Sequence, residues 1–517
     1  MLVMEKFYIT TAIPYVNASP HAGFALEIIQ ADLIARYYRL LGKKVYFLTG
    51  TDENALKNVQ AAEAEGIKTE KLVNKYAIQF KALKEALNLA FDDFIRTTEK
   101  RHIKGAQKLW LACKKDIYKK NYQGWYCVGC EEFKTKKDLE KGKCPEHPNR
   151  KLELVKEENY FFKLSQYQDK LYQLIKNDRL KITPQERKNE VLSFIKSGLK
   201  DFSISRSIKR AKGWGIPVPN DSSQIIYVWF DALINYITAL GYANNKELFQ
   251  EFWLKNKNIL HCIGKGIIRF HAVYWPAMLL SANLPLPSQE LVHGYLTSEG
   301  QKMSKSLGNI VNPIKLVKKY GTDALRYYLL KEIPPTKDGD FNIKHFEEVY
   351  NADLANGLGN LVSRILAMVK KYCHSQIPKI DSDPEKHPLR ISTKIYNWKN
   401  AYKNRDKALK NYKFNEALIS IWKYITTADK YIDENKPWEL AKKDKNKLNY
   451  ILYGLLDSLH QLAWMLYPFL PDTSLKIAKT LQIKELLVKN PNSKNSWINI
   501  KPGTKIKIPT KPLFPRV

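Results

Sequence analysis

The chain has 517 residues, too many for one hydrophobic core, so roughly three or four domains are expected. Its 85 basic and 52 acidic residues give a net charge of +33, which favours a polyanionic partner such as nucleic acid, although a lysine-rich genome would produce the same excess. The most apolar region, Ile259–Leu284, is interrupted by Lys265, Arg269 and His271, so no membrane span is expected. Six cysteines without a signal peptide argue against a disulfide framework and favour a soluble, cytoplasmic protein.

The first part of the chain predicts a strand, a helix and a second strand. Lys6–Ala12 is rich in β-branched and aromatic residues, as buried strands are. Apolar residues then recur at helical spacing from Ala25 to Leu41, and Val45–Leu48 forms a second apolar run that leads into Asp52. This order is typical of a doubly wound parallel sheet, in which ligands bind at the carboxyl ends of the strands.

His21 and Gly23 lie between the first strand and the first helix. The amino end of a helix offers free N–H groups and a positive dipole end, a glycine leaves room for a ligand, and a histidine donates a hydrogen bond. The pair therefore predicts a phosphate site, although the same pattern also occurs in ordinary turns.

A second phosphate-binding candidate is the segment Lys302-Met303-Ser304-Lys305-Ser306, which is flanked by Gly300 and Gly308. Flanking glycines favour a loop that can move, and two lysines with neighbouring serines can contact several phosphate oxygens. Read alone, the segment is also compatible with a solvated basic loop.

These segments together resemble the signatures of the class I aminoacyl-tRNA synthetases, and Thr11–Gly23 and Phe47–Glu53 are similar to methionyl-tRNA synthetases. The resemblance implies ATP-dependent activation of methionine, with Mg²⁺ bound to the ATP, and transfer to tRNA(Met). It implies catalytic roles for His21, Lys302 and Lys305. The implied ATP-binding residues are His21, Gly23, Arg206, His293, Gly294, Lys302, Ser304 and Lys305. The implied methionine-binding residues are Ile13, Tyr15, Asp52, Trp229, Tyr236 and His271, with Asp52 holding the amino group.

A metal site is predicted between the two halves of the sheet. Cys127 and Cys130 form one closely spaced pair, and Cys144 and His147 form another. Three thiolates and an imidazole match a closed tetrahedral zinc site, which leaves no open position for catalysis. We therefore expect a structural Zn²⁺, with unliganded surface cysteines as the alternative.

The return to the sheet is expected at Ile225–Asp231, an apolar run that predicts a buried strand. The aromatic residues that follow suit a thioether side chain, because sulfur makes favourable contacts with rings. Taken singly, such residues are more often ordinary core aromatics. Arg206 has two interpretations, a contact to the nucleotide phosphates or an exposed structural arginine.

The chain departs from the family pattern at several positions. Phe24 stands where the first signature has a second histidine, and Asn54 and Ala55 replace a His-Gly pair. Leu233 replaces a proline, and Gly266 replaces an aspartate. Of these changes, Phe24 and Gly266 predict a thinner phosphate cradle opposite the lysine loop.

Long helices are expected from Asn351 onward, where apolar residues such as Leu354, Leu358 and Leu361 alternate in steps of four and three. This pattern predicts a helix bundle. Polar residues on a bundle surface are usually only solvated. The resemblance implies that Asn360, Arg364 and Trp438 bind the anticodon by stacking and hydrogen bonding.

The expected fold is a Rossmann-like doubly wound parallel sheet with an inserted zinc-binding domain, followed by an all-α helix bundle. Two other readings remain open, a class I synthetase for leucine, isoleucine or valine, and a paralogue that binds tRNA without charging it. No membrane and no obligatory protein partner are expected, and a monomer is favoured. The expected segments are 1–115 and 224–298 (catalytic halves), 116–223 (insertion), 299–345 (lysine loop and linking region), 346–485 (anticodon-binding domain) and 486–517 (tail).

Overall fold

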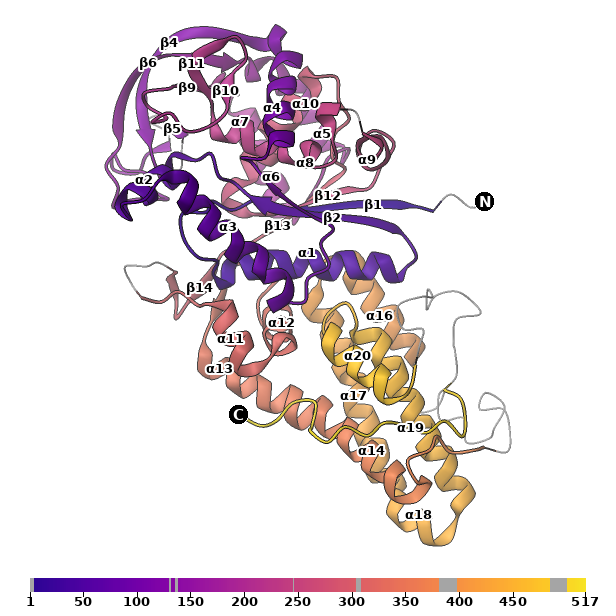
Figure 1. Ribbon diagram of the computed structural model, residues 1–517. Coiled ribbons are helices and arrows are strands. Elements are labelled where there is room, and N and C mark those ends of the chain that lie inside the picture. The colour runs from indigo at the N-terminus through magenta and orange to yellow at the C-terminus, as the bar shows by residue number, and fades with distance from the viewer. Residues whose placement is uncertain are drawn as a thin grey trace. The chain divides into compact units, whose positions relative to one another are not determined.

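The computed structural model describes residues 4–129, 132–134, 138–244, 246–303, 308–380, 398–483 and 500–517. The chain forms two compact units (Figure 1). The first unit contains Met1–Ala31, Lys44–Lys84 and Ala90–His293, and the second contains Asp32–Lys43, Glu85–Leu89 and Gly294–Val517.

A six-stranded sheet organises the first unit, and all its pairings are parallel. Its strand order reverses beside β1, which lies between β2 and β12, so the carboxyl ends of these strands form the crevice in which such sheets bind ligands. The doubly wound parallel sheet is thus confirmed. In spatial order the strands are β3 (Asp93–Arg96), β2 (Lys44–Thr51), β1 (Lys6–Thr11), β12 (Ile259–Gly264), β13 (Gln289–His293) and β7 (Lys181–Thr183).

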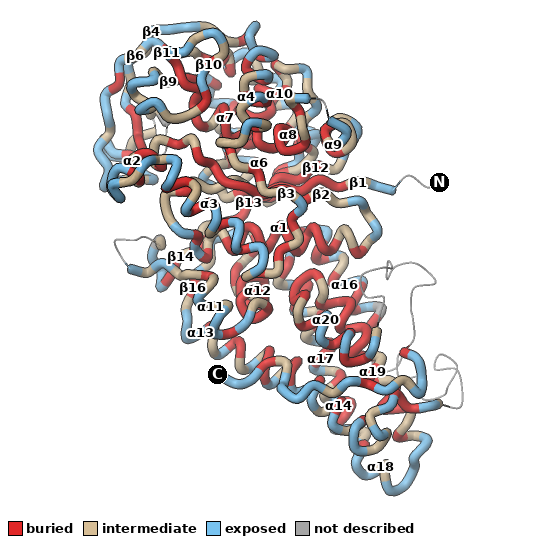
Figure 2. The backbone as a smooth tube through the Cα atoms, in the orientation of Figure 1, coloured by how far each residue is buried: buried red, intermediate tan, exposed pale blue. Residues whose placement is uncertain are grey.

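Helices cover both faces of this sheet (Figure 1). On one face, strand residues such as Tyr8 and Ile263 share a core with residues of four helices. Their bounds are α4 (Lys100–Ala112), α7 (Val228–Leu233), α8 (Asn235–Thr238) and α10 (Trp275–Ser281). Helices α1 (Ala22–Leu40), α2 (Leu56–Ala64) and α3 (Thr69–Ala86) come from the first half of the chain. The strands run buried through this core (Figure 2).

One predicted strand is wrong. Ile225–Asp231 does not re-enter the parallel sheet, because β11 ends at Ile226 and Val228–Leu233 is helix α7. Strand β11 (Asp221–Ile226) instead pairs antiparallel with β9 (Ser205–Ser207) and β10 (Pro217–Val218) in a sheet of their own. A short apolar run has the same composition in a buried helix as in a buried strand, so periodicity could not separate the two.

Between β3 and β12 the chain also forms a four-stranded antiparallel sheet, whereas β7 from the same stretch joins the parallel sheet. A long ladder from Ile117↔Phe162 to Tyr126↔Glu153 joins the two main strands of the antiparallel sheet. The strands are β4 (Ile117–Cys127), β5 (Glu132–Lys134), β6 (Glu153–Phe162) and β8 (Phe202–Ser203), and helices α5 (Gln168–Lys176) and α6 (Gln185–Lys196) follow β6.

The second unit is largely helical, which confirms the predicted bundle. Leu354, Leu358, Leu361 and Ile365 are all fully buried, as their spacing predicted. The unit also contains a small sheet of β14 (Leu296–Ser298), β15 (Gln301–Lys302) and β16 (Gly339–Phe341). Its helices are α11 (Pro313–Tyr320), α12 (Thr322–Lys331), α13 (Ile343–Val349), η8 (Tyr350–Gly359), α14 (Asn360–Cys373), α16 (Trp398–Lys410), α17 (Phe414–Asn435), α18 (Pro437–Lys443), α19 (Lys445–Leu466) and α20 (Pro471–Thr480).

The last described stretch, residues 500–517, returns along the bundle (Figure 1). The N–H of Ile377 donates to the carbonyl of Thr504 at 2.9 Å, and the hydroxyl of Tyr350 donates to the carbonyl of Pro515 at 2.8 Å. These contacts fasten the end of the chain to the segments around α14. Within the described part of the chain, no helix combines the length and the apolarity that a bilayer span needs.

Candidate functional site

Tyr236 and His271 form a buried polar pair beside the parallel sheet. Tyr236 lies on α8 and His271 on the π-helical segment η7 (Phe270–Tyr274), and their Oη and Nε2 atoms are 2.7 Å apart. Nδ1 of His271 lies 3.0 Å from the carbonyl of Ile267, which only accepts, so Nδ1 carries the ring hydrogen. Burial lowers the pKa of His271 to about 4, so the ring is neutral at pH 7. The Tyr236 hydroxyl therefore donates to Nε2.

An aromatic wall adjoins this pair. The rings of Trp229 and Phe270 stack at 3.8 Å with an interplanar angle of 4°, and Tyr15 meets Trp229 edge-on at 6.5 Å. Phe270 and His271 are consecutive, so η7 connects the wall to the polar pair. Ile13 is half-buried against the same core. The structure brings together Tyr15, Trp229, Tyr236 and His271, and it adds Phe270, for which no sequence pattern indicated a role.

Asp52 follows the carboxyl end of β2 and is almost fully buried, at 2% exposure. Its backbone is fixed from two sides, since its N–H donates to the carbonyl of Pro14 at 2.9 Å and its own carbonyl accepts from Asn58 Nδ2 at 3.0 Å. Tyr15 and Asp52 also form an isolated parallel bridge. The backbone of Asp52 is thereby paired with that of Tyr15, whose ring belongs to the aromatic wall.

Glu53 fixes the same loop through its carboxylate and its backbone carbonyl. Its fully buried carboxylate accepts from Arg96 at 2.6 and 3.0 Å and from the Thr51 hydroxyl at 2.9 Å. Trp214 Nε1 donates to the Glu53 carbonyl at 2.8 Å. Sequence reasoning missed this anchor, and an acidic residue at the end of a buried strand was the only signal for it.

His21 stands just before α1, where the sequence placed a phosphate site. Its Nδ1 accepts from the N–H of Gly23 at 3.0 Å, which leaves Nε2 with the hydrogen in a neutral ring. A Cβ atom at Gly23 would lie 2.8 Å from Cε1 of His21, so a side chain here would displace the imidazole. Phe24 packs edge-on against Phe80 of α3 at 5.2 Å. Phe24 is half-buried, and its ring takes part in packing α1 against α3.

His293 ends β13 and is 8% exposed. Its Nε2 lies 2.8 Å from Glu27 Oε2, and Glu27 Oε1 accepts from the N–H of Ala12 at 2.8 Å. Glu27 therefore ties the ends of β13 and β1 together and fixes the imidazole at the crevice.

The lysine segment is described in part. Lys302 belongs to β15, where it pairs with Thr297, and Gly300 and Gly308 adopt φ angles of +73° and +66° that favour glycine. Ser304 and Lys305 lie outside the described residues. At Gly294, a Cβ atom would fall 2.2 Å from the carbonyl carbon of Lys337, so the backbone itself requires a glycine here.

Arg206 lies on β9 and is only 7% exposed, which rules out the reading as an exposed arginine. Its guanidinium lies over the rings of Tyr227 and Phe133 at 4.2 and 5.0 Å. One amino group donates to Ser203 Oγ at 2.9 Å and to the Ser205 carbonyl at 2.7 Å. Arg206 also lines a small pocket together with Asn54, Arg210 and Trp214.

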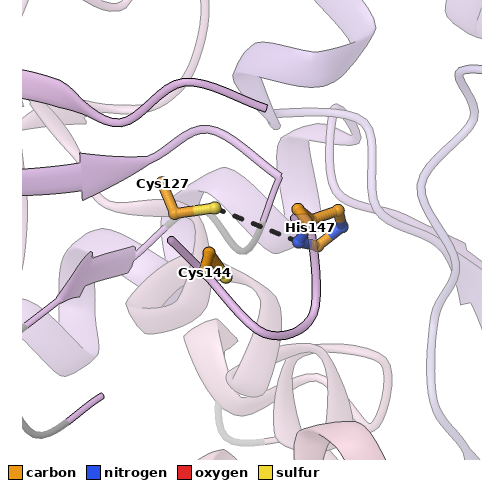
Figure 3. Close-up of side chains that lie close together, drawn as sticks. All are labelled: Cys127, Cys144 and His147. Carbon is orange, nitrogen blue, oxygen red and sulfur yellow. Dashed lines mark hydrogen bonds between the residues drawn. The ribbon is translucent and has the colours of Figure 1, made fainter. Parts of the chain in front are cut away.

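Cys127, Cys144 and His147 converge in the inserted segment, and their ligand atoms all lie within 4.8 Å of one another (Figure 3). Both cysteines are buried, and Cys127 Sγ lies 3.9 Å from His147 Nδ1. A Cβ atom at Gly129 would fall 2.4 Å from His147 Cγ, so a glycine at this position lets His147 approach the turn that follows Cys127. Cys130 lies outside the described residues.

The three residues expected at the anticodon come from helices of the second unit. Asn360 begins α14 and is exposed. Arg364, one turn later, makes ion pairs to Asp429 at 2.5 Å and Asp433 at 2.6 Å. Trp438 lies on α18 with 43% of its surface exposed.

Comparison with known proteins defines the class. Residues 7–153 and 148–366 match the family described as "tRNA synthetases class I (M)", and residues 396–508 match the anticodon-binding domain of tRNA ligases. The parallel sheet with its crevice and the helical second unit are thus those of a class I aminoacyl-tRNA synthetase.

Individual relatives narrow this class. The methionine–tRNA ligase of Thermotoga maritima is 42% identical over 521 residues, covering 99% of this chain and 80% of the relative. That of Synechocystis is 46% identical over 491 residues, covering 92% and 90%. The structure of Mycobacterium tuberculosis methionyl-tRNA synthetase in complex with methionyl-adenylate is 38% identical, with a TM-score of 0.92 and coverage of 99% and 100%. The chain belongs to the methionyl-tRNA synthetase family, and the resemblance is confirmed.

Proposed function

We propose that this chain activates L-methionine with ATP and transfers it to tRNA(Met). In the first step the methionine carboxylate attacks the α-phosphorus of ATP, the bond to the bridging oxygen breaks, and pyrophosphate leaves. In the second step the terminal ribose hydroxyl of the tRNA attacks the carbonyl of methionyl-adenylate and releases AMP. Relatives named methionine–tRNA ligase, of which this chain covers 80% and 90%, support the reading over another class I specificity or an inactive paralogue.

The observation that carries the proposal is the combination of Asp52 with the Tyr236–His271 pair in one unit. A buried carboxylate suits the ammonium group of an amino acid. The neutral pair and the wall of Tyr15 and Trp229, with Ile13 beside them, suit a thioether, since sulfur gains roughly 0.3–1.5 kcal/mol from each ring contact. Both requirements of methionine are met at one edge of the sheet.

The residues proposed for ATP surround the start of α1 and the end of β13. The hydrogen on His21 Nε2 suits a phosphate oxygen, Gly23 leaves room beside it, and His293 with Gly294 suits the adenosine. Catalysis then requires in-line positioning and charge stabilisation, without a covalent intermediate. Lys302, Ser304 and Lys305 are proposed to supply most of that charge. Aromatic rings and serine residues enclose Arg206, so its guanidinium is proposed to be a positive charge with a fixed position rather than a mobile one.

We propose that Cys127, Cys130, Cys144 and His147 hold a structural Zn²⁺. The three described residues fit this metal, because two buried thiols and an imidazole converge within bonding reach of one ion. The ion would cross-link the turn after β4 to residues 144–147, and the catalytic steps do not pass through it.

The second unit is proposed to bind the anticodon loop. Exposed Trp438 offers a ring on which an unpaired base can stack, and Asn360 and Arg364 offer hydrogen-bond donors to base edges. Asp429 and Asp433 hold the Arg364 guanidinium in place, so binding of a base or phosphate would compete with these carboxylates.

Amino-acid-dependent exchange of pyrophosphate into ATP tests the first step without tRNA. We expect exchange with methionine and at most background exchange with leucine, isoleucine or valine. Exchange with one of those three instead would refute the specificity. No exchange with any amino acid, together with retained binding of tRNA, would favour the inactive paralogue.

A further inference from the structure

A buried chain of hydrogen bonds connects three helices and the loop that carries Asp52. His102 of α4 lies with Nε2 2.5 Å from Asp231 Oδ1 of α7, and its Nδ1 lies 2.8 Å from the Thr238 hydroxyl of α8. All three residues have no exposed surface. The approach of α4 to α8 depends on Gly105, where a Cβ atom would fall 2.3 Å from Thr238 Cγ2.

The second oxygen of Asp231 reaches the loop after β2. Asn54 Nδ2 donates to Asp231 Oδ2 at 2.7 Å and also lies 3.3 Å from the carbonyl of Thr97. The backbone N–H of the same Asn54 donates to Asp52 Oδ1 at 3.3 Å. Asn54 is therefore fixed by its side chain to Asp231 and contacts the Asp52 carboxylate through its main chain.

We propose that His102, Asp231 and Asn54 are positioning residues that orient the Asp52 carboxylate for the ammonium group of methionine. This inference rests on the proposed function, because it takes Asp52 to be the amine-binding group. It adds a role for residues that never touch the substrate.

The chemistry explains why each member is needed. A buried carboxylate is costly unless hydrogen bonds satisfy it, and Asp231 receives one bond on each oxygen, from His102 and from Asn54. A change in either donor leaves that carboxylate underbonded and lets the Asn54 backbone move. The main-chain N–H then no longer meets Asp52 Oδ1 in a fixed direction.

The network also sets a chemical requirement at position 54. The Asn54 amide presents an N–H to Asp231. The donor toward Asp231 is the property this position must keep. A variant that keeps a donor should therefore work, and one that replaces it by an acceptor should fail.

The test uses the full-length protein and competitive inhibition of methionine-dependent pyrophosphate exchange. One inhibitor is methioninol, which keeps the ammonium group and the thioether. The other is the deaminated analogue of methionine, which lacks the ammonium group. Three variants are compared. Asn54→Asp keeps the shape of the side chain but replaces the donor, whereas Asn54→His keeps a donor. His102→Gln keeps a donor toward Asp231 but loses the bond to Thr238. His460→Gln removes a buried histidine of the helical unit as a matched control.

Asn54→Asp is expected to raise the Ki of methioninol by about tenfold, the loss typical of one hydrogen bond to a charged group. The Ki of the deaminated analogue and the KM for ATP should stay within about twofold. The Ki of methioninol for Asn54→His and for His460→Gln should be close to that of the wild type. The Ki for His102→Gln should lie between the wild-type value and the value for Asn54→Asp.

An unchanged Ki of methioninol in Asn54→Asp would overturn the inference. So would an equal loss for both inhibitors, which would indicate a general collapse of the pocket. A wild type without methionine-dependent exchange would instead refute the proposed function, so the two failures are distinguishable.

Discussion

The Tyr236 hydroxyl donates to Nε2 of His271 at 2.7 Å, in a site where both side chains are buried. The direction of this bond follows from the carbonyl of Ile267, which fixes the ring hydrogen on Nδ1. The hydroxyl hydrogen of Tyr236 therefore forms its hydrogen bond within the protein. The proposed methionine pocket would thus present a neutral, polarisable surface, as a thioether requires.

Replacing Tyr236 by phenylalanine is expected to raise the KM for methionine by about tenfold without changing the KM for ATP. The variant leaves Nε2 of His271 buried without its donor, a loss of about 1–3 kcal/mol. Steady-state exchange kinetics measure both constants. Tyr453→Phe removes another buried hydroxyl, which donates to the Ile500 carbonyl at 3.1 Å, and should leave both constants unchanged. Equal KM values for methionine in Tyr236→Phe and the wild type would contradict the assignment.

The stability of the protein should fall in mildly acid solution because of His271. Its pKa is about 4 in the folded chain and 6.5 when unfolded, so the unfolded state binds more protons between these values. The stabilisation is fully present above pH 6.5 and is lost as the pH falls toward 4, by about 3 kcal/mol.

Urea unfolding at pH 7 and pH 4.5, compared between the wild type and His271→Asn, isolates this contribution. The variant should lose less stability than the wild type over this interval. Parallel losses in the two proteins would mean that His271 is not the titrating group.

The inserted segment should contain one zinc ion per chain. Cys144→Ser is expected to lose the metal and to become sensitive to proteolysis within residues 117–162, because a structural zinc contributes directly to local folding. Elemental analysis and limited proteolysis measure these effects. Cys373→Ser, which changes a half-buried cysteine of α14, should keep its zinc. Retention of a full equivalent of zinc by Cys144→Ser would refute this ligand.

Arg364→Gln should raise the KM for tRNA by about tenfold and leave methionine-dependent exchange unchanged, since a base contact is worth about 1–3 kcal/mol. Asp433→Asn should do the opposite and lower the KM for tRNA, because it removes a carboxylate that lies 2.6 Å from the guanidinium. Aminoacylation kinetics at varied tRNA concentrations measure the KM for tRNA of both variants. An Arg364→Gln enzyme with normal aminoacylation would place the anticodon elsewhere.

The sequence predicted those parts of the fold that local pattern determines. Strand β1 ends within a residue of its predicted bound, and α1 begins at Ala22, three residues before the predicted start. The apolar stripe that includes Leu354 and Leu358 is buried as its spacing requires. These features depend on periodicity, which a single sequence displays.

What the sequence could not predict depends on contacts between distant segments. The stack of Trp229 on Phe270 and the bond from Asn54 to Asp231 join residues far apart in the chain. The run Ile225–Asp231 had a composition that fits a strand, yet the chain turns into α7 there because Val228, Phe230 and Leu233 are buried on a helix. Resemblance to a family suggested which residues line a methionine pocket, but it could not supply the direction of a hydrogen bond.

The most direct test is to identify the amino acid that the enzyme attaches. Purified protein is incubated with ATP, an equimolar mixture of the common amino acids and a tRNA transcript with a CAU anticodon, and the ester is analysed by mass spectrometry. Methionine should be the dominant amino acid on the tRNA, and Asp52→Ala should abolish its attachment. A tRNA charged with leucine, isoleucine or valine, or no charging by an enzyme that still binds the transcript, would contradict the proposed function.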